Sequence, residues 1–299
     1  MHSAYLCWIA PGKASTPALR RSRFRQALFA NFKRNLGRYH DYDVTAKFIR
    51  SVIPARWRPI GYLEQLVRSR TGGRIPKGPF AGMRYIDNAF GSAYVPKLLG
   101  IYERELNPFI EQACALNFPL IIDVGAAEGY YAIGMALRNP GARVVAFEME
   151  QKGRVALEEM AKLNGVLSRV EIRGKCKPED LAQLLAASGR ALILCDVEGD
   201  EEILFDPEVN SSLARARLLV EMHEFISLGI SERITKRFAA THTVRRIWQE
   251  DRHRSDFPFA TLATRLLPRS YLDWSVNEWR PERMSWLWME PRLPDATTH

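Results

Sequence analysis

Residues 121–150, IIDVGAAEGYYAIGMALRNPGARVVAFEME, combine an apolar run, a glycine-bearing turn, a helix-like stretch and a second apolar run. A strand followed by such a turn and a helix is a general arrangement for presenting backbone N–H groups to a ligand. Three carboxylates accompany the turn: Asp123 precedes it, Glu128 lies within it, and Glu148 follows the second run. The ligand that binds here must therefore tolerate negative charge on both sides of the turn.

Further apolar runs repeat this pattern along the chain. We expect strands at 119–124, 143–148, 169–173, 191–196, 216–221, 243–249 and 285–289. Helical stretches separate the first five, and proline, asparagine or glycine residues bound them, as at Asn139-Pro140-Gly141. This alternation predicts an α/β fold with a doubly wound, Rossmann-like sheet, whose ligands bind at the carboxyl ends of the parallel strands.

Positive charge is concentrated in the first 80 residues. They contain 16 Lys or Arg residues and three acidic residues, a net charge of +13, whereas the whole chain carries +9 and the remainder is therefore −4. Glycine, proline and basic residues between 70 and 79 indicate a linker. We therefore expect a basic, mainly helical extension or cap at 1–80 and a globular domain at 81–299.

The extension contains a basic amphipathic helix pattern at 24–39. One interpretation is a cap helix with a solvated basic face, and another is a contact with an anionic membrane surface or RNA. No run reaches the roughly 18 apolar residues that a membrane span needs. The four cysteines lack the spacing of a disulfide framework or a zinc site and suit a reducing compartment. We therefore expect a cytoplasmic protein with, at most, a peripheral membrane contact.

The turn departs from the fingerprint of nicotinamide dinucleotide sites. Gly125 and Gly129 are spaced GxxxG, and Ala127 stands between them. We expect Glu128 to lie where a dinucleotide places its pyrophosphate, and like charges in contact cost roughly several kcal/mol in a partly dry site. S-adenosylmethionine instead carries a sulfonium and an ammonium, and Glu148 can accept hydrogen bonds from both ribose hydroxyls. The turn thus favours S-adenosylmethionine over NAD.

Four segments resemble class I S-adenosylmethionine-dependent methyltransferases, and more narrowly the FkbM-like family. They are IIDVGAAEGYY at 121–131, VVAFEME at 144–150, LILCDVEGDEE at 192–202 and LLVEMHE at 218–224. The portion DVEGDE is the most specific, and the likeness covers roughly residues 95–290. The resemblance implies a seven-stranded sheet with an antiparallel last strand, S-adenosylmethionine as the cofactor, and methyl transfer as the reaction.

The resemblance also implies which residues bind the cofactor, all of them near the ends of the first four strands. They are Asp123, Gly125, Ala126, Ala127, Glu128, Gly129, Glu148, Met149, Lys175, Cys176 and Asp196. Within this set, Gly125, Ala126 and Gly129 are expected to line the methionine portion. Asp123 is expected to support the turn or the amino group of the ligand.

The remaining members of this set concern the ribose, the adenine and the methyl group. Glu148 is expected to hold the ribose, and Met149 to lie against the adenine. Lys175 and Cys176, after the third strand, stand where further adenine contacts occur in the family that the chain resembles. Asp196, at the end of the fourth strand, is expected to face the methyl group and the acceptor.

Methyl transfer to a hydroxyl needs alignment of the acceptor and removal of a proton. The candidate catalytic residues follow the fourth and fifth strands: Asp196, Glu198 and His223, with Glu221 and Glu224 beside them. The imidazole of His223 suits a base because it titrates near neutrality, although a lone histidine at a strand end also serves structural hydrogen bonding. These side chains could instead hold a divalent ion, but their spacing matches no dedicated metal motif, so we predict no metal ligands.

The acceptor is expected to be a hydroxyl on a small molecule or glycan. The segment after the fourth strand lacks the Asn- or Asp-Pro-Pro-aromatic pattern typical of base N-methylation. Two alternatives stay open: an RNA-directed methyltransferase that uses residues 1–80, and a non-catalytic methyltransferase-like binding module. The aromatic and arginine-rich stretch 251–283 is interpreted as a substrate-side lid, or as a contact with a second subunit or the cap. Trp286 and Trp288 alternate within a strand, which indicates packing.

Overall fold

The fold is known from a computed structural model that describes residues 58–87, 89 and 93–292. The chain divides into two units, Met1–Asp41 and Tyr42–His299, and every described residue belongs to the second unit. The predicted basic helix at 24–39 lies outside the described residues.

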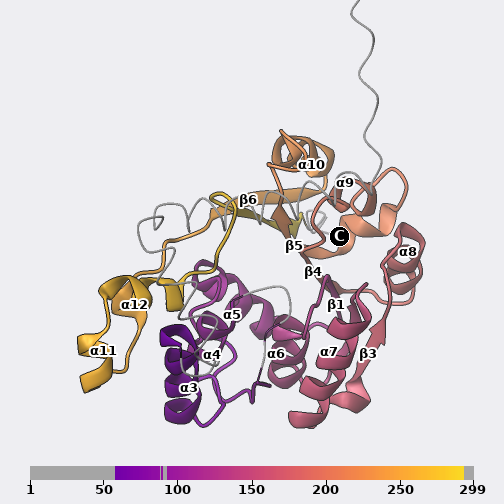
Figure 1. The fold of residues 1–299 in the computed structure, drawn as a ribbon. Helices are drawn as coiled ribbons and strands as arrows, with labels where there is room; N and C mark the ends of the chain where they lie inside the picture. Colours follow the sequence, from indigo (N-terminus) through magenta and orange to yellow (C-terminus); the bar gives the residue numbers. More distant parts are fainter. Residues whose placement is uncertain (1–57, 88, 90–92, 293–299) are drawn as a thin grey trace, which may run out of the picture. The chain divides into compact units, whose positions relative to one another are not determined.

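Seven strands form one mixed sheet in the order β3-β2-β1-β4-β5-β7-β6 (Figure 1). The first five strands are parallel, and β7 is antiparallel to both β5 and β6. The strands are β1 (Leu120–Val124), β2 (Arg143–Phe147), β3 (Val170–Arg173), β4 (Ala191–Cys195), β5 (Arg217–Met222), β6 (His242–Trp248) and β7 (Ser285–Pro291). Each overlaps its predicted range, and the predicted fold class with an antiparallel last strand is confirmed.

Helices connect the parallel strands and begin or end at the expected residues. They are α6 (Tyr130–Arg138), α7 (Gln151–Leu163), η4 (Leu167–Arg169), α8 (Pro178–Ala186), α9 (Glu201–Leu204), η5 (Ser211–Arg215) and α10 (Ile230–Phe238). Helix α6 ends before Asn139-Pro140, and α8 begins at Pro178, whose missing N–H costs nothing in a first helical turn. These prolines therefore set helix boundaries in the way that the sequence indicates.

Two further groups of helices flank this core. Before the sheet lie α3 (Pro59–Thr71), α4 (Tyr94–Leu99), η3 (Arg104–Leu106) and α5 (Asn107–Ala115), and between β6 and β7 lie η6 (Arg254–Asp256), α11 (Leu262–Leu266) and α12 (Arg269–Val276). Helix α12 contacts α3 and α4, so the stretch 251–283 packs partly against the segment that precedes the sheet. No helix among the described residues is long and apolar enough to cross a membrane.

The two faces of the sheet bury separate apolar clusters. Ile121, Leu194 and Trp288 belong to the cluster that includes residues of α3–α7, whereas Ile122 and Ile193 belong to the cluster with residues of α8–α10. This separation follows from the alternation of side chains along each strand. The predicted packing role of the strand tryptophans is thereby confirmed.

The segment before the sheet contributes to the same core. Leu63 and Val67 of α3 are fully buried in the cluster that contains α4–α7, and Ile75 and Phe80 are also buried there. The described part of the predicted extension, from residue 58 to residue 80, therefore packs with the sheet. A truncation that preserves this packing must end before residue 58.

The contact between Phe80 and α6 gives a first test. Gly134→Ala places a Cβ 2.4 Å from the Phe80 ring, whereas a Cβ at Gly141 meets nothing within 4 Å. Overpacking of this kind costs about 1–3 kcal/mol, against about 1 kcal/mol gained from the higher helix propensity of alanine. We expect Gly134→Ala to lower the free energy of unfolding in urea by up to about 2 kcal/mol. Gly141→Ala is the control, and equal stability of the two variants would contradict the packing.

Candidate functional site

The turn after β1 brings three strand ends together. Gly125 has a φ of +88°, and a Cβ there would lie 1.9 Å from the carbonyl oxygen of Asp196. Only glycine permits this close approach between the segments that follow β1 and β4. The backbone N–H groups of Gly125 and Ala126 donate to the carbonyl oxygen of Phe147, at 2.9 and 3.0 Å. The turn is thus attached to the end of β2 and packed on the end of β4.

Glu148 lies directly after β2 and holds the turn from its other side. Its Oε2 accepts a hydrogen bond from the N–H of Ala127 at 2.9 Å, and its Oε1 accepts one from Glu150 at 2.7 Å. Burial raises the pKa of Glu148, and these two N–H groups oppose that rise. Ala127 has a φ of +49°, a backbone conformation that is strained for a residue with a Cβ. The hydrogen bond that its N–H donates to Glu148 helps to hold the turn in this conformation.

Asp123 is buried on β1, behind the turn. Its Oδ2 accepts no hydrogen bond among the described residues. Burial, together with the negative charges of Asp196 and Glu148, raises the pKa of Asp123 to about 7. A hydrogen bond from the N–H of Ala132 and the positive charge of Lys97 oppose this rise. The site therefore contains an unsatisfied buried acceptor close to two further carboxylates.

The environment of Glu128 differs from the one expected from the sequence. Its side chain is fully buried, its Oε1 lies 2.5 Å from Nζ of the buried Lys97, and it accepts a hydrogen bond from the hydroxyl of Tyr85. Lys97 also lies over the Tyr102 ring, 4.9 Å from its centroid. This pairing corrects the expectation that the charge of Glu128 opposes a pyrophosphate at the turn, because Lys97 compensates it. The assignment of Glu128 as a cofactor-binding residue stays a prediction.

The residues expected around the adenine have unlike surroundings. Met149 is 40% exposed beside Glu148 and offers an apolar surface. Lys175 forms an ion pair with Asp200, with 2.8 Å between Nζ and Oδ2. Cys176 is buried in the apolar cluster with α8–α10, and burial raises the pKa of its thiol to about 12. Met149 therefore has the surface that an adenine contact needs, whereas the Cys176 thiol is enclosed by protein.

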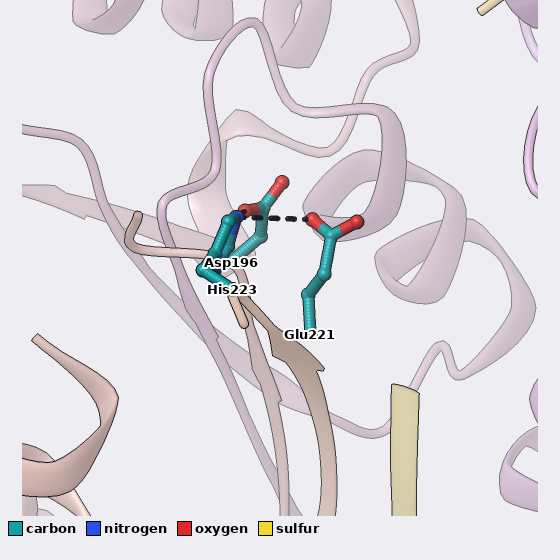
Figure 2. A group of neighbouring side chains, drawn as sticks. All are labelled: Asp196, Glu221 and His223. Carbon is teal, nitrogen blue, oxygen red and sulfur yellow. Dashed lines mark ion pairs between the residues drawn. The ribbon is translucent and has the colours of Figure 1, made fainter. Parts of the chain in front are cut away.

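The candidate catalytic residues meet at the ends of β4 and β5. Figure 2 shows Asp196, Glu221 and His223 pointing toward one another. Nε2 of the buried His223 lies 3.4 Å from Oδ1 of Asp196 and 3.7 Å from Oε2 of Glu221. Its Nδ1 lies 2.5 Å from Oε1 of Glu201, at the start of α9. One imidazole is thus surrounded by three carboxylates.

These contacts determine the protonation of His223. Burial would lower its pKa, but hydrogen bonds and charges from Asp196, Glu201 and Glu221 raise it well above the ordinary value. Burial would raise the pKa of Asp196, but the hydrogen bond to His223 and the charge of Arg280 hold it below its usual range. An imidazolium, in which both ring nitrogens are protonated, accepts no further proton. The role of His223 as a base stays a prediction, and its surroundings suit a fixed position better than proton uptake.

Glu198 and Glu224 have different environments. Glu198 is exposed, adopts a φ of +53° and lies in the same loop as Asp196. Glu224 accepts hydrogen bonds from the N–H groups of Gly229 and Ser231, at 2.7 and 3.2 Å, and so caps the start of α10. Of these two carboxylates, Glu224 is engaged by the start of α10, whereas the side chain of Glu198 is exposed to solvent.

The structure adds residues that sequence reasoning missed. Nη1 of Arg280 lies 2.7 Å from Oε1 of Glu221, and the same guanidinium pairs with Glu103 and donates to Tyr102 at 3.0 Å. Arg280 belongs to the stretch that was interpreted as a lid or contact segment, so this stretch supplies a residue to the site. Glu201 lies within the family-like segment DVEGDEE, which was the only signal for it.

Comparisons with known proteins add a distant likeness in fold. No protein-family model matches the chain, and no curated protein matches its sequence. A human methyltransferase 10 domain containing protein is similar with a TM-score of 0.42 and 12% identity, over 75% of this chain and 96% of that one. A candidate O-methyltransferase from Klebsiella pneumoniae has a TM-score of 0.39 and 12% identity, over 82% and 96%.

A precorrin-6y C5,15-methyltransferase from Geobacter metallireducens has a TM-score of 0.36 and 14% identity, over 47% of this chain and 75% of that one. Similarity at this level assigns neither substrate nor cofactor. The function of this chain has to be inferred from its own geometry.

The buried pair of Lys97 and Glu128 gives a second test. Lys97→Met leaves the Glu128 carboxylate buried without its cation, which costs about 3–5 kcal/mol of unfolding free energy. Combining it with Glu128→Gln removes that charge, so we expect the double variant to be more stable than the sum of the single losses predicts. Urea unfolding of the four proteins measures the coupling. Additive losses would contradict the pairing.

The raised pKa of Asp123 predicts a pH dependence. Because the folded pKa of about 7 exceeds the ordinary 3.8, the folded protein holds a proton that the unfolded chain has released between these pH values. The contribution of Asp123 to stability therefore falls as the pH rises from about 4 to about 7. We expect Asp123→Asn to gain stability over the wild type across this range, by up to roughly 4 kcal/mol. A stability difference that is flat with pH would contradict the assignment.

Proposed function

We propose that the protein is an S-adenosylmethionine-dependent methyltransferase that methylates a hydroxyl group on a small molecule or glycan. The observation that carries this proposal is the position of two carboxylates around one glycine turn. Glu148 hydrogen-bonds to the turn at Ala127, and the backbone of Asp196 touches it at Gly125. Carboxylates at the ends of neighbouring strands create a site that is suited to a cation and unfavourable for a diphosphate.

The residues at the turn fit the parts of S-adenosylmethionine. The unsatisfied Oδ2 of Asp123 matches the chemistry of an ammonium group near the turn. Each oxygen of Glu148 has a second lone pair that a ribose hydroxyl can use. The exposed surface of Met149 suits the adenine ring. When bound, S-adenosylmethionine supplies an electrophilic methyl group on a sulfonium centre.

The acceptor side of the site supports a hydroxyl. Asp196 is partly exposed beside the turn, and the exposed Glu198 lies two residues further along the same loop. These carboxylates can orient an acceptor hydroxyl and take up its proton. The close packing of Gly125 on Asp196 holds their loop at a set distance from the cofactor turn. The RNA-directed alternative depends on basic residues that lie mostly outside the described part of the chain.

Calorimetry with S-adenosylmethionine tests the proposal and separates it from a non-catalytic module. We expect Glu148→Ala to weaken binding by roughly 1.5–3 kcal/mol, the scale of charge-assisted hydrogen bonds. Glu150→Ala is the matched control, because Glu150 is exposed next to Glu148 and its side chain does not cap α7. No heat of binding to the folded wild-type protein would contradict the proposed function. Equal affinities of the two variants would remove Glu148 from the site.

A further inference from the structure

Three side chains of metal-ligating type converge at the ends of β4 and β5. Asp196, Glu221 and His223 each offer one ligand atom, and these atoms all lie within 4.8 Å of one another (Figure 2). Nε2 of His223 lies 3.4 Å from the Asp196 oxygen and 3.7 Å from the Glu221 oxygen. If each atom binds one ion at about 2.1 Å, the ligand–ion–ligand angles are about 110° and about 120°, respectively. The two distances from Nε2 of His223 are thus compatible with ligands that share one ion.

An unsatisfied oxygen points to a ligand at the same place. Glu221 is fully buried, and its Oε1 is held by Arg280 at 2.7 Å. Its Oε2, on the side of His223, accepts no hydrogen bond among the described residues. Leaving a buried carboxylate oxygen without a hydrogen bond costs free energy, and a cation between Glu221 and His223 removes that cost.

Glu201 orients the imidazole for such a role. The fully buried Glu201 lies 2.5 Å from Nδ1 of His223 and also accepts a hydrogen bond from the N–H of Gly199 at 3.1 Å. With the Nδ1 proton donated to Glu201, a metal ion that displaces the proton on Nε2 binds the lone pair of Nε2, on the side of Asp196 and Glu221. A carboxylate behind a histidine is the usual support of a metal-bound imidazole. Glu201 is therefore a positioning residue.

The charge around the cluster also favours a cation. Glu103, Glu201 and Glu221 are each at most 1% exposed, and Asp196 lies beside them. Arg280 pairs with Glu103 and Glu221 and compensates one of these four charges, and the protonated imidazole of His223 compensates a second. Like charges at this depth repel strongly because little water screens them. A divalent ion offsets the excess.

We propose that Asp196, Glu221 and His223 bind one divalent metal ion next to the methyl acceptor. A set of two carboxylates and one imidazole suits Mn²⁺, Fe²⁺ or Zn²⁺ better than Ca²⁺, which prefers oxygen ligands alone. The role of the ion rests on the proposed function: the acceptor hydroxyl binds it, gives its proton to the carboxylate of Glu198, and uses the freed oxygen lone pair for the new C–O bond. The S–C bond breaks and its electron pair goes to sulfur.

Metal titration of the full-length, EDTA-stripped protein tests the site. Calorimetry and electron paramagnetic resonance with Mn²⁺, and calorimetry with Zn²⁺, are expected to show one bound ion per chain. We expect Asp196→Asn to weaken binding at least about tenfold, and Glu201→Gln to weaken it about 10- to 100-fold. Asp200→Asn is the matched control, because Asp200 lies in the same loop but pairs with Lys175; its affinity should stay within about twofold of the wild type.

Circular dichroism verifies that each variant is folded. Absence of Mn²⁺ and Zn²⁺ binding to the wild type, or equal affinities of Asp196→Asn and Asp200→Asn, overturns the metal site. Binding of S-adenosylmethionine is measured separately in EDTA. Cofactor binding without metal binding overturns this inference alone, whereas metal binding without cofactor binding overturns the proposed function and leaves the metal site standing.

Discussion

The close contact between Gly125 and the backbone of Asp196 is the constraint on which the site depends. Any side chain at residue 125 would collide with the carbonyl oxygen that follows β4. Because this contact is made through backbone, it sets the distance between the turn that is proposed to hold the methyl donor and the loop that is proposed to hold the acceptor. Alignment of two reactants is the main task of the proposed methyl transfer, and this glycine contact is what would fix their separation.

Buried charge shapes both sides of this contact in different ways. Near the turn, Lys97 neutralises Glu128, so the negative potential that remains there comes from Glu148 and from the ionised form of Asp123, whose pKa is raised to about 7. Near the acceptor, Arg280 from the segment between β6 and β7 compensates only part of the carboxylate charge. This surplus supports both proposals, a sulfonium bound on one side of Gly125 and a divalent ion bound on the other.

Much of the fold was predictable from the sequence because its signals are local. Each strand is an apolar run with a clear end, and residues such as Pro178 mark helix boundaries within a few positions. The positions of Asp123, Glu148 and Asp196 at strand ends followed directly, since parallel strands end at the same edge of a sheet.

Pairing partners were not predictable, because they come from distant parts of the chain. The segment that contains Lys97 looks like an ordinary helix, and only tertiary packing shows that its amine neutralises Glu128. Arg280 lies in a stretch whose composition suggested a lid, and no spacing rule connects it to Glu221, 59 residues earlier. The prediction of no metal ligands rested on spacing along the chain, whereas the cluster of Asp196, Glu221 and His223 arises from two adjacent strands.

The most direct measurement is a crystal structure of the protein grown with S-adenosylhomocysteine and NAD both present. We predict S-adenosylhomocysteine over residues 123–130, with its ribose hydroxyls on the carboxylate of Glu148. NAD bound over the same residues, with its pyrophosphate at the turn, would contradict the account.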